Sequence, residues 1–201
     1  HTKKIKRGET RAPIISFGQK SWVPPPEQND VCMKCHNDFG RLVWFGSAHE
    51  RQRVVCAECH VSHSQVDPMR THKGQLEICT QCHVKERSEF NRTSTHPVRY
   101  GELRCSQCHN PHGSFAVKLL RERTKNDVCY SCHAEKRGPF LWIHAPVMED
   151  CGNCHEHNGS MNPALLKKRT PLLCQQCHSP IGHPSVAYTP DGLPGATPSP
   201  F

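Results

Sequence analysis

The pattern Cys-x-x-Cys-His occurs seven times in this chain of 201 residues. In each copy, two thiols stand at the spacing that forms thioethers with the edge of a porphyrin, and the histidine can ligate the iron of a c-type haem. The predicted attachment residues are Cys32, Cys35, Cys56, Cys59, Cys79, Cys82, Cys105, Cys108, Cys129, Cys132, Cys151, Cys154, Cys174 and Cys177. The predicted proximal iron ligands are His36, His60, His83, His109, His133, His155 and His178.

These motifs use all 14 cysteines, so no thiol remains for a disulfide or a free nucleophile. A zinc-ribbon array also needs Cys-x-x-Cys pairs, but it does not need a histidine after every second cysteine. A disulfide framework would not need the pairing at all. We therefore predict seven covalently bound haem c groups, each with its iron.

The chain has few apolar residues from which to build a hydrophobic core. Only 35% of the residues are hydrophobic, and the chain has 17 prolines, 13 glycines and a mean hydropathy of -0.69. Such a chain tends toward disorder unless a cofactor supplies apolar surface. We predict an elongated multihaem cytochrome c fold, mainly irregular with short α-helices, in which the haems form the core and no folded form exists without them.

The motifs recur in pairs. Openings at Cys32, Cys79, Cys129 and Cys174 are 47, 50 and 45 residues apart, and a second motif follows each of the first three openings. We predict dihaem repeats of about 47 residues. The expected domains are a basic, proline-containing arm (1–31), a heptahaem domain (32–185) with units 32–78, 79–128 and 129–173 and half unit 174–185, and a Pro/Gly-rich tail (186–201).

Local patterns give three further expectations. Each motif histidine is expected in a short helical turn, because two thioethers need a compact loop. The three prolines at residues 24–26 favour extended chain. Helices are expected over 114–123, from the spacing of Phe115 and Leu119, and over 162–169, where Asn162 precedes a proline.

Histidines outside the motifs follow the same period. His49, His96 and His144 each lie between the two motifs of a unit, and His63, His112 and His157 each follow a second motif. His183 follows the seventh motif; His1 and His72 are left over, and His72 is the reserve. His157 stands two residues after its motif, where its counterparts stand three after. The six recurring histidines and His183 are the predicted distal ligands. We expect His112 to ligate the iron of a haem other than the one attached to its own motif.

Seven distal candidates for seven irons close every iron to substrate. A haem enzyme keeps one axial position open, whereas an electron carrier fills both. The sequence therefore predicts an electron carrier with bis-histidine haems and no catalytic residues. A multihaem reductase of a small nitrogen or sulfur compound is the alternative of a different class.

Charge and hydropathy bear on partners and location. The formal net charge is +8, but each oxidised haem contributes roughly -1, so seven offset about -7. Nucleic acid is therefore not expected as a partner, and other redox proteins are.

No stretch of 18 apolar residues is present to form a transmembrane helix. Because haem attachment takes place outside the bacterial cytoplasm, we expect an exported chain whose signal has been removed.

Several segments resemble a known family. The run His109-Asn-Pro-His-Gly113, the stretch 138–151 and the stretch 171–178 leading to His183-Pro-Ser185 are similar to periplasmic decahaem cytochromes of the DmsE/MtrA type. The resemblance covers about residues 30–195, although members carry ten motifs and this chain has seven. It implies a wire from periplasmic donors through an outer-membrane β-barrel to an extracellular acceptor. It also implies distal ligands at His49, His63, His96, His112, His144, His157 and His183. A subunit of an extracellular cytochrome filament is the alternative assembly.

Overall fold

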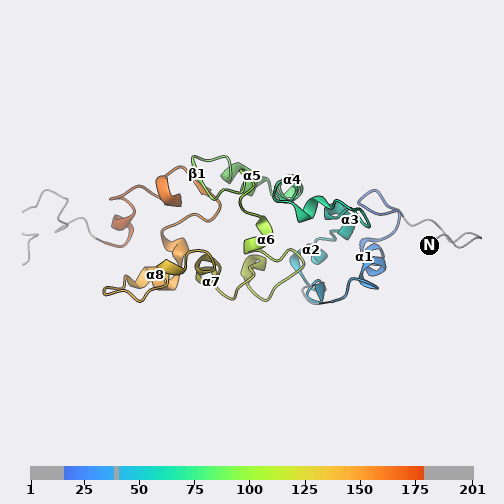
Figure 1. Cartoon of the computed structure of the whole chain (residues 1–201), viewed down its shortest axis with the longest axis horizontal. Helices are drawn as coiled ribbons and strands as arrows, with labels where there is room; N and C mark the ends of the chain where they lie inside the picture. Colours follow the sequence, from blue (N-terminus) through green and yellow to red (C-terminus); the bar gives the residue numbers. More distant parts are fainter. Residues whose placement is uncertain (1–15, 39–40, 179–201) are drawn as a thin grey trace, which may run out of the picture.

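The computed structural model describes residues 16–38 and 41–178. Within these ranges the chain is drawn out along one axis, with α1 near one end and the last described residues at the other (Figure 1). His183, the predicted tail and residues 1–15 of the predicted arm lie outside the described residues. No helix in the part that the structure describes is long and apolar enough to cross a membrane.

The elements are short and joined by irregular chain, which confirms the prediction of a mainly irregular fold with short α-helices. The α-helices are α1 (Pro25–Met33), α2 (Ala48–Arg51), α3 (Cys56–Cys59), α4 (His72–Cys82), α5 (Val84–Glu89), α6 (Cys105–Cys108), α7 (Lys125–Tyr130) and α8 (Ala145–Glu149). The 3₁₀ turns are η2 (Pro68–Arg70), η3 (Val117–Leu119), η4 (Ala134–Lys136), η5 (Cys151–Asn153), η6 (Pro163–Leu165) and η7 (Cys174–Gln176). One antiparallel ladder joins β1 (Ser94–Thr95) to β2 (Gly159–Ser160).

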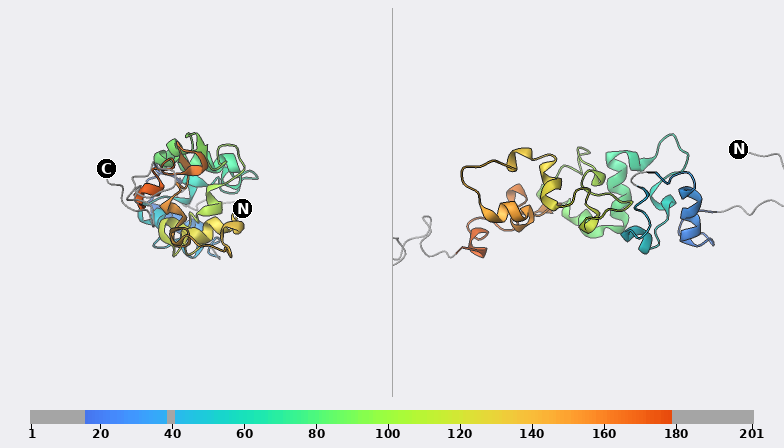
Figure 2. Two further views of the ribbon diagram at one scale, coloured as in Figure 1. Left: turned by 90° about the vertical axis from the view of Figure 1, so that its left-hand side faces the viewer. Right: turned by 90° about the horizontal axis from the view of Figure 1, so that it is seen from below.

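The elements lie along two long sides of the molecule. Helices α3, α4 and α5 and strand β1 follow one side in Figure 1, and α7 and α8 lie on the opposite side. Seen along the long axis, the ribbon has a rounded outline, and the view from below shows the same elongated body (Figure 2). Because the elements succeed one another along this axis, the haem motifs are spread along its length.

The protein itself supplies few buried apolar side chains. Those in the described residues are Val23, Trp44, Val55, Met69, Phe90, Val98 and Leu120. Many large apolar side chains are exposed, including Phe115, Leu141 and Trp142. Burial of apolar area is the main favourable term in folding, so this polypeptide has a small hydrophobic core of its own.

The helices that lead into opening motifs have clear starts. Thr71 caps α4 by accepting a hydrogen bond from the Gly74 N–H at 3.0 Å, and Thr124 caps α7 by accepting one from the Asp127 N–H at 3.1 Å. Such caps satisfy backbone donors that have no partner within the helix. Helix α1 begins at Pro25, so the expectation of extended chain through the prolines is wrong beyond Pro24. Proline suits a first helical turn because its missing N–H is not needed there.

The two longer helices expected after second motifs do not form. Over 114–123 only η3 is present, and over 162–169 only η6. Lys118 and Ala164 have positive φ angles of 54° and 53°, which break a right-handed helix. The side chain of Asn162, expected to cap a helix, donates instead to the Leu166 and Lys167 carbonyls.

Three buried amide side chains tie neighbouring motifs together. Asn29 accepts from the Cys56 N–H at 2.9 Å and donates to the Val54 carbonyl at 3.0 Å. Asn126 accepts from the Cys151 N–H at 2.7 Å, and Gln75 accepts from the Ser106 N–H at 3.1 Å. In each case the amide precedes an opening motif and holds the first turn of the next motif.

Candidate haem-binding centre

All seven motifs adopt the same local turn. The N–H of each motif histidine donates to the carbonyl of the first cysteine four residues earlier, at 2.8–3.0 Å. This single helical turn brings both thiols and the imidazole of a motif to one place, as attachment of one haem requires. The expectation of a short helical turn at each motif is confirmed.

First cysteines of neighbouring motifs lie side by side. The thiol of Cys56 lies near that of Cys32, and the thiol of Cys129 lies near that of Cys151. Burial, with the neighbouring thiol, raises the pKa of Cys56 to about 11, and burial with Cys151 raises the pKa of Cys129 to about 11. The thiols of Cys79 and Cys105 form a third close pair. These pairs bring attachment points of consecutive motifs together.

Second cysteines make the intervening connections. Burial is the main cause that raises the pKa of Cys59, and the thiol of Cys82 adds to it. Burial raises the pKa of Cys108 in the same way, with the next contribution from Cys132. The thiols of adjacent motifs are therefore near one another at each step from the first motif to the sixth.

Four motif histidines each face one histidine from outside the motifs. The ring centres are 6.1 Å apart for His49 and His83, 5.9 Å for His60 and His112, 6.5 Å for His96 and His133, and 6.0 Å for His144 and His178. An axial iron–nitrogen bond of about 2 Å puts a ring centre about 3 Å from the metal, so two axial imidazoles of one iron have ring centres about 6 Å apart. The four separations match that spacing.

The remaining candidates are not paired in this way. Among the described residues, no second histidine ring lies at this spacing from His36, His109 or His155. His63 is exposed and has a positive φ angle of 55°. His183 lies outside the described residues. His72, the reserve, is the first residue of α4.

His157 does not occupy the place of His112 in its loop. The Nδ1 atom of His49 lies 2.8 Å from the Pro111 carbonyl, and that of His96 lies 2.7 Å from the His157 carbonyl. His157 therefore stands where Pro111 does, and Asn158 stands where His112 does. The Asn158 amide donates to Glu89 at 2.9 Å.

Ring nitrogens are held so that the second nitrogen can bind a metal. Nδ1 of His109 lies 2.9 Å from the Lys118 carbonyl, and Nδ1 of His155 lies 2.7 Å from the Ala164 carbonyl. Donation from Nδ1 leaves Nε2 as the free lone pair, which is the usual arrangement of a metal-ligating histidine. Burial lowers the pKa of His112 and of His157, which favours the neutral, ligating form.

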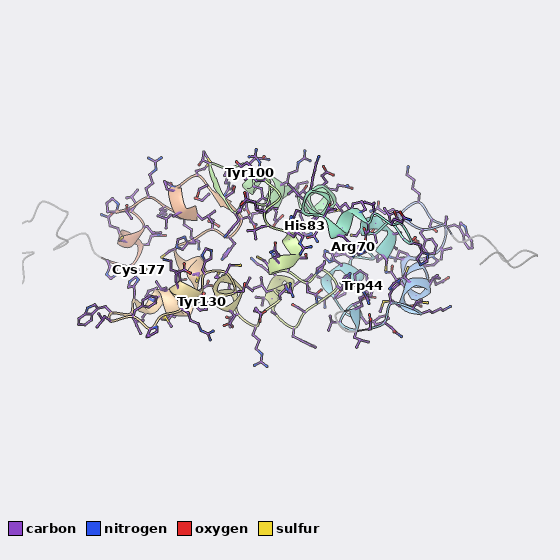
Figure 3. The ribbon with its side chains drawn as sticks, viewed as in Figure 1. Trp44, Arg70, His83, Tyr100, Tyr130 and Cys177 are labelled. Carbon is purple, nitrogen blue, oxygen red and sulfur yellow. The ribbon has the colours of Figure 1, made fainter. Side chains whose placement is uncertain are left out.

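Space and unpaired donors also fit a haem. A cavity of about 920 Å³ is lined by His60, His109 and His112, among others, and cofactor sites commonly have volumes of 300–1,000 Å³. Four buried donor atoms in the described residues lack a hydrogen-bond partner: Arg41 Nε, Trp44 Nε1, Arg104 Nε and Tyr130 Oη. Haem propionates are acceptors for such groups. Figure 3 places Trp44, His83 and Cys177 at successive positions along the molecule.

Comparisons with known proteins agree with this centre. A family model described as a doubled CXXCH motif matches residues 96–138 and 144–183, and one described as cytochrome c-type protein NrfB-like matches residues 1–82. The chain belongs to the multihaem c-type cytochromes. The multiheme cytochrome MtrA of Shewanella baltica is 49% identical over 176 residues, which are 88% of this cytochrome and 53% of that protein.

Two other relatives are more distant. The high-molecular-weight cytochrome c of Nitratidesulfovibrio vulgaris is 27% identical over 153 residues, which are 74% of this chain and 25% of the relative. The cytochrome c-type protein NrfB of Escherichia coli is 43% identical over 47 residues, 22% of this chain and 24% of NrfB. This cytochrome thus spans about half or less of the length of the relatives it matches.

Sequence reasoning missed two kinds of supporting residue. Asn29 and Asn126, whose amides are buried, each begin an Asn-Asp-Val-Cys sequence that leads into an opening motif. That sequence does not indicate which backbone groups the two amides bond to. Asp67 places its carboxylate 2.6 Å from His60 Nδ1. Asp67 has no counterpart at the other motifs, so the repeat could not have identified it.

Proposed function

We propose that this cytochrome segment is a non-enzymatic electron-transfer wire carrying seven haem c groups, each iron ligated by two histidines. The observation that supports it most strongly is the set of four histidine ring pairs at 5.9–6.5 Å. Each pair joins one motif histidine to one predicted distal ligand. When bound, each haem iron supplies a one-electron couple between its ferric and ferrous states.

The haems are numbered 1 to 7 in the order of their motifs. On this proposal the iron ligands are His60 and His112 for haem 2, His83 and His49 for haem 3, His133 and His96 for haem 5, and His178 and His144 for haem 7. For each of these four haems, the distal histidine and the motif histidine belong to different dihaem units. Iron ligation would therefore link successive units. His112 serves haem 2 rather than its own haem 4.

His63, His157 and His183 remain as distal ligands for haems 1, 4 and 6. His157 reaches its iron from the position next to that of His112, because Asn158 holds the equivalent place. The recurring amide contacts of Asn29 and Asn126 support the dihaem unit as the building block.

The neighbouring thiols support a continuous path. First cysteines are adjacent for haems 1 and 2, 3 and 4, and 5 and 6, and second cysteines approach for haems 2 and 3 and for haems 4 and 5. With haems attached at these thiols, the polypeptide would hold the edges of haems 1 to 6 near one another. Electrons can then pass along the chain in sequence order.

The wider pathway follows from the family resemblance. We place this cytochrome outside the cytoplasm, in the periplasm or at the outer membrane, where it passes electrons from periplasmic donors toward an outer-membrane or extracellular acceptor. Other redox proteins are its partners, with an outer-membrane β-barrel as the assembly partner. A filament of like subunits is the alternative assembly, which electron microscopy of the native complex distinguishes.

Carbon monoxide tests the wire against a reductase. Ferrous haem binds carbon monoxide only when an axial position is open. We expect the absorption spectrum of the fully reduced protein to be unchanged by the gas, and intact mass to report seven haems. Rapid carbon monoxide binding by one haem, together with nitrite consumption, would favour the reductase instead.

A further inference from the structure

Three second-motif histidines can be compared directly. His60, His109 and His155 each follow the last cysteine of a second motif, and each has an Nδ1 hydrogen-bond partner. For His109 and His155 that partner is a backbone carbonyl. For His60 it is the Oδ2 atom of Asp67, at 2.6 Å.

The loops around His109 and His155 match closely. The Asn110 N–H donates to the Leu119 carbonyl at 2.7 Å, and the Glu156 N–H donates to the Leu165 carbonyl at 2.7 Å. Isolated β-bridges join His109 to Leu120 and His155 to Leu166. These two histidines are therefore references for a haem whose ligand donates to a neutral acceptor.

Asp67 is held in position by its own loop. Its Oδ1 atom accepts the Met69 N–H at 3.0 Å at the start of η2, and its side chain is 17% exposed. Aspartate is ordinarily ionised at neutral pH, so Asp67 places a carboxylate oxygen against His60 Nδ1.

Other motif histidines have no carboxylate this close. The Glu86 carboxylate lies 3.8 Å from His83 Nδ1, and the Glu135 carboxylate lies 3.8 Å from His133 Nδ1. Both distances exceed that of a hydrogen bond. Across residues 16–38 and 41–178, Asp67 is the one carboxylate within hydrogen-bonding distance of a motif histidine ring nitrogen.

We propose that Asp67 tunes haem 2, holding its reduction potential below those of haems 4 and 6. This proposal rests on the proposed ligation of haem 2 by His60. A carboxylate acceptor makes the ligating imidazole more basic, which favours the ferric iron. Reduction lowers the positive charge at the iron. A nearby negative charge stabilises the more positive ferric state, so it makes reduction less favourable.

The role of Asp67 is that of a positioning residue, because it acts on the iron through His60. Reduction of haem 2 takes one electron from a neighbouring ferrous haem, which becomes ferric, and no proton needs to move. Haem 2 is then reduced after haems 4 and 6 when the electron supply is limited. Haem 2 would then have a lower reduction potential than haems 4 and 6, and it lies near the N-terminal end of the wire.

The test is a potentiometric titration of the holoprotein carrying Asp67→Asn, followed by absorption. Asparagine keeps an oxygen for the Met69 N–H but loses the charge. We expect one of the seven one-electron steps to move to higher potential by at least tenfold in its equilibrium constant, or about 59 mV. Electron paramagnetic resonance should show a change in one low-spin component. Glu86→Gln is the matched control: its carboxylate is partly exposed and makes no hydrogen bond to His83, so its removal should move the titration by clearly less than Asp67→Asn does.

Asp67→Ser provides a second variant, since serine can also accept the Met69 N–H. An unchanged titration of both variants, with seven low-spin haems present, would overturn the role of Asp67 and leave the wire intact. Loss of haem from both variants would also overturn it, because Asp67 would then serve assembly instead of potential. Appearance of high-spin haem in the parent protein would count against the proposed function itself.

Discussion

At the scale of single residues, the spacing between histidine rings carries the functional argument. His112 lies with its ring 5.9 Å from that of His60, and the two planes are inclined by only 13°. Trp44 packs edge-on against His112 with ring centres 6.5 Å apart and is itself buried. His112 is therefore held in place by packing as well as by its expected iron.

Removing His112 should open one haem. In His112→Ala we expect about one-seventh of the haem to become high-spin and to bind carbon monoxide when reduced, because haem 2 loses its distal ligand. Absorption and electron paramagnetic resonance measure both changes. His72→Ala is the control and should leave all haems low-spin. A fully low-spin His112→Ala protein would rule out His112 as the ligand.

At the scale of elements, each short helix is stabilised by its contacts with the next motif. Hydrophobic contacts are few, so buried polar contacts such as those of Asn126 are important. The Asn126 amide accepts from the Cys151 N–H and donates to the Val147 and Met148 carbonyls. These bonds join α7, α8 and η5, which carry the fifth and sixth motifs and the predicted ligand between them.

Loss of the Asn126 amide should be costly. Asn126→Ala leaves a buried N–H without a partner, so we expect the free energy of unfolding to fall by about 1–3 kcal/mol. Guanidinium unfolding of the holoprotein, followed by circular dichroism, measures it. The control is Asn91→Ala, which removes an exposed amide that donates to the Arg87 carbonyl at the end of α5. It should change the free energy of unfolding by less than about 0.5 kcal/mol. Equal effects of the two variants would contradict the role of Asn126.

An ion pair between α7 and Asp150, the residue that precedes η5, should give a weak pH dependence. Lys125 Nζ lies 2.6 Å from Asp150 Oδ2. Burial opposes ionisation of Asp150, but hydrogen bonds from Lys125 and the Gly152 N–H outweigh it and lower its pKa below 3.8. A lowered carboxyl pKa stabilises the fold above the unfolded pKa, and that stabilisation is lost as the pH falls through the folded pKa.

We therefore expect Asp150→Asn to be less stable than the parent at pH 7 by under about 1 kcal/mol, since the pair is partly exposed. The difference should shrink as the pH falls below about 4. Unfolding midpoints measured at pH 7 and at successively lower pH test this. A gap that widens in acid would contradict it.

At the scale of the whole molecule, the chain progresses along one long axis from its first described residues to its last (Figure 2). In the proposed ligation of haems 2, 3, 5 and 7, the motif histidine and the distal histidine belong to successive units. Each of these four haems would then cross-link units that share little apolar contact. The elongated shape and the small protein core are consequences of the same arrangement.

The sequence alone predicted the attachment sites, the irregular fold and the recurrence of histidines such as His112. It did not predict which histidines face each other, since His49 and His83 meet only through the winding of the chain. The helical spacing of residues 114–123 was misleading. There His109 Nδ1 bonds to the Lys118 carbonyl, and the positive φ angles of Lys118 and Leu119 bend the chain sharply.

Spin-state counting of the oxidised protein is the most direct test of a closed, seven-haem wire. Electron paramagnetic resonance with spin quantitation distinguishes ferric iron with two histidine ligands, which is low-spin, from ferric iron with one. We expect seven low-spin haems per chain and no high-spin signal. A high-spin signal equal to one haem or more would contradict the wire and show an iron open to ligands.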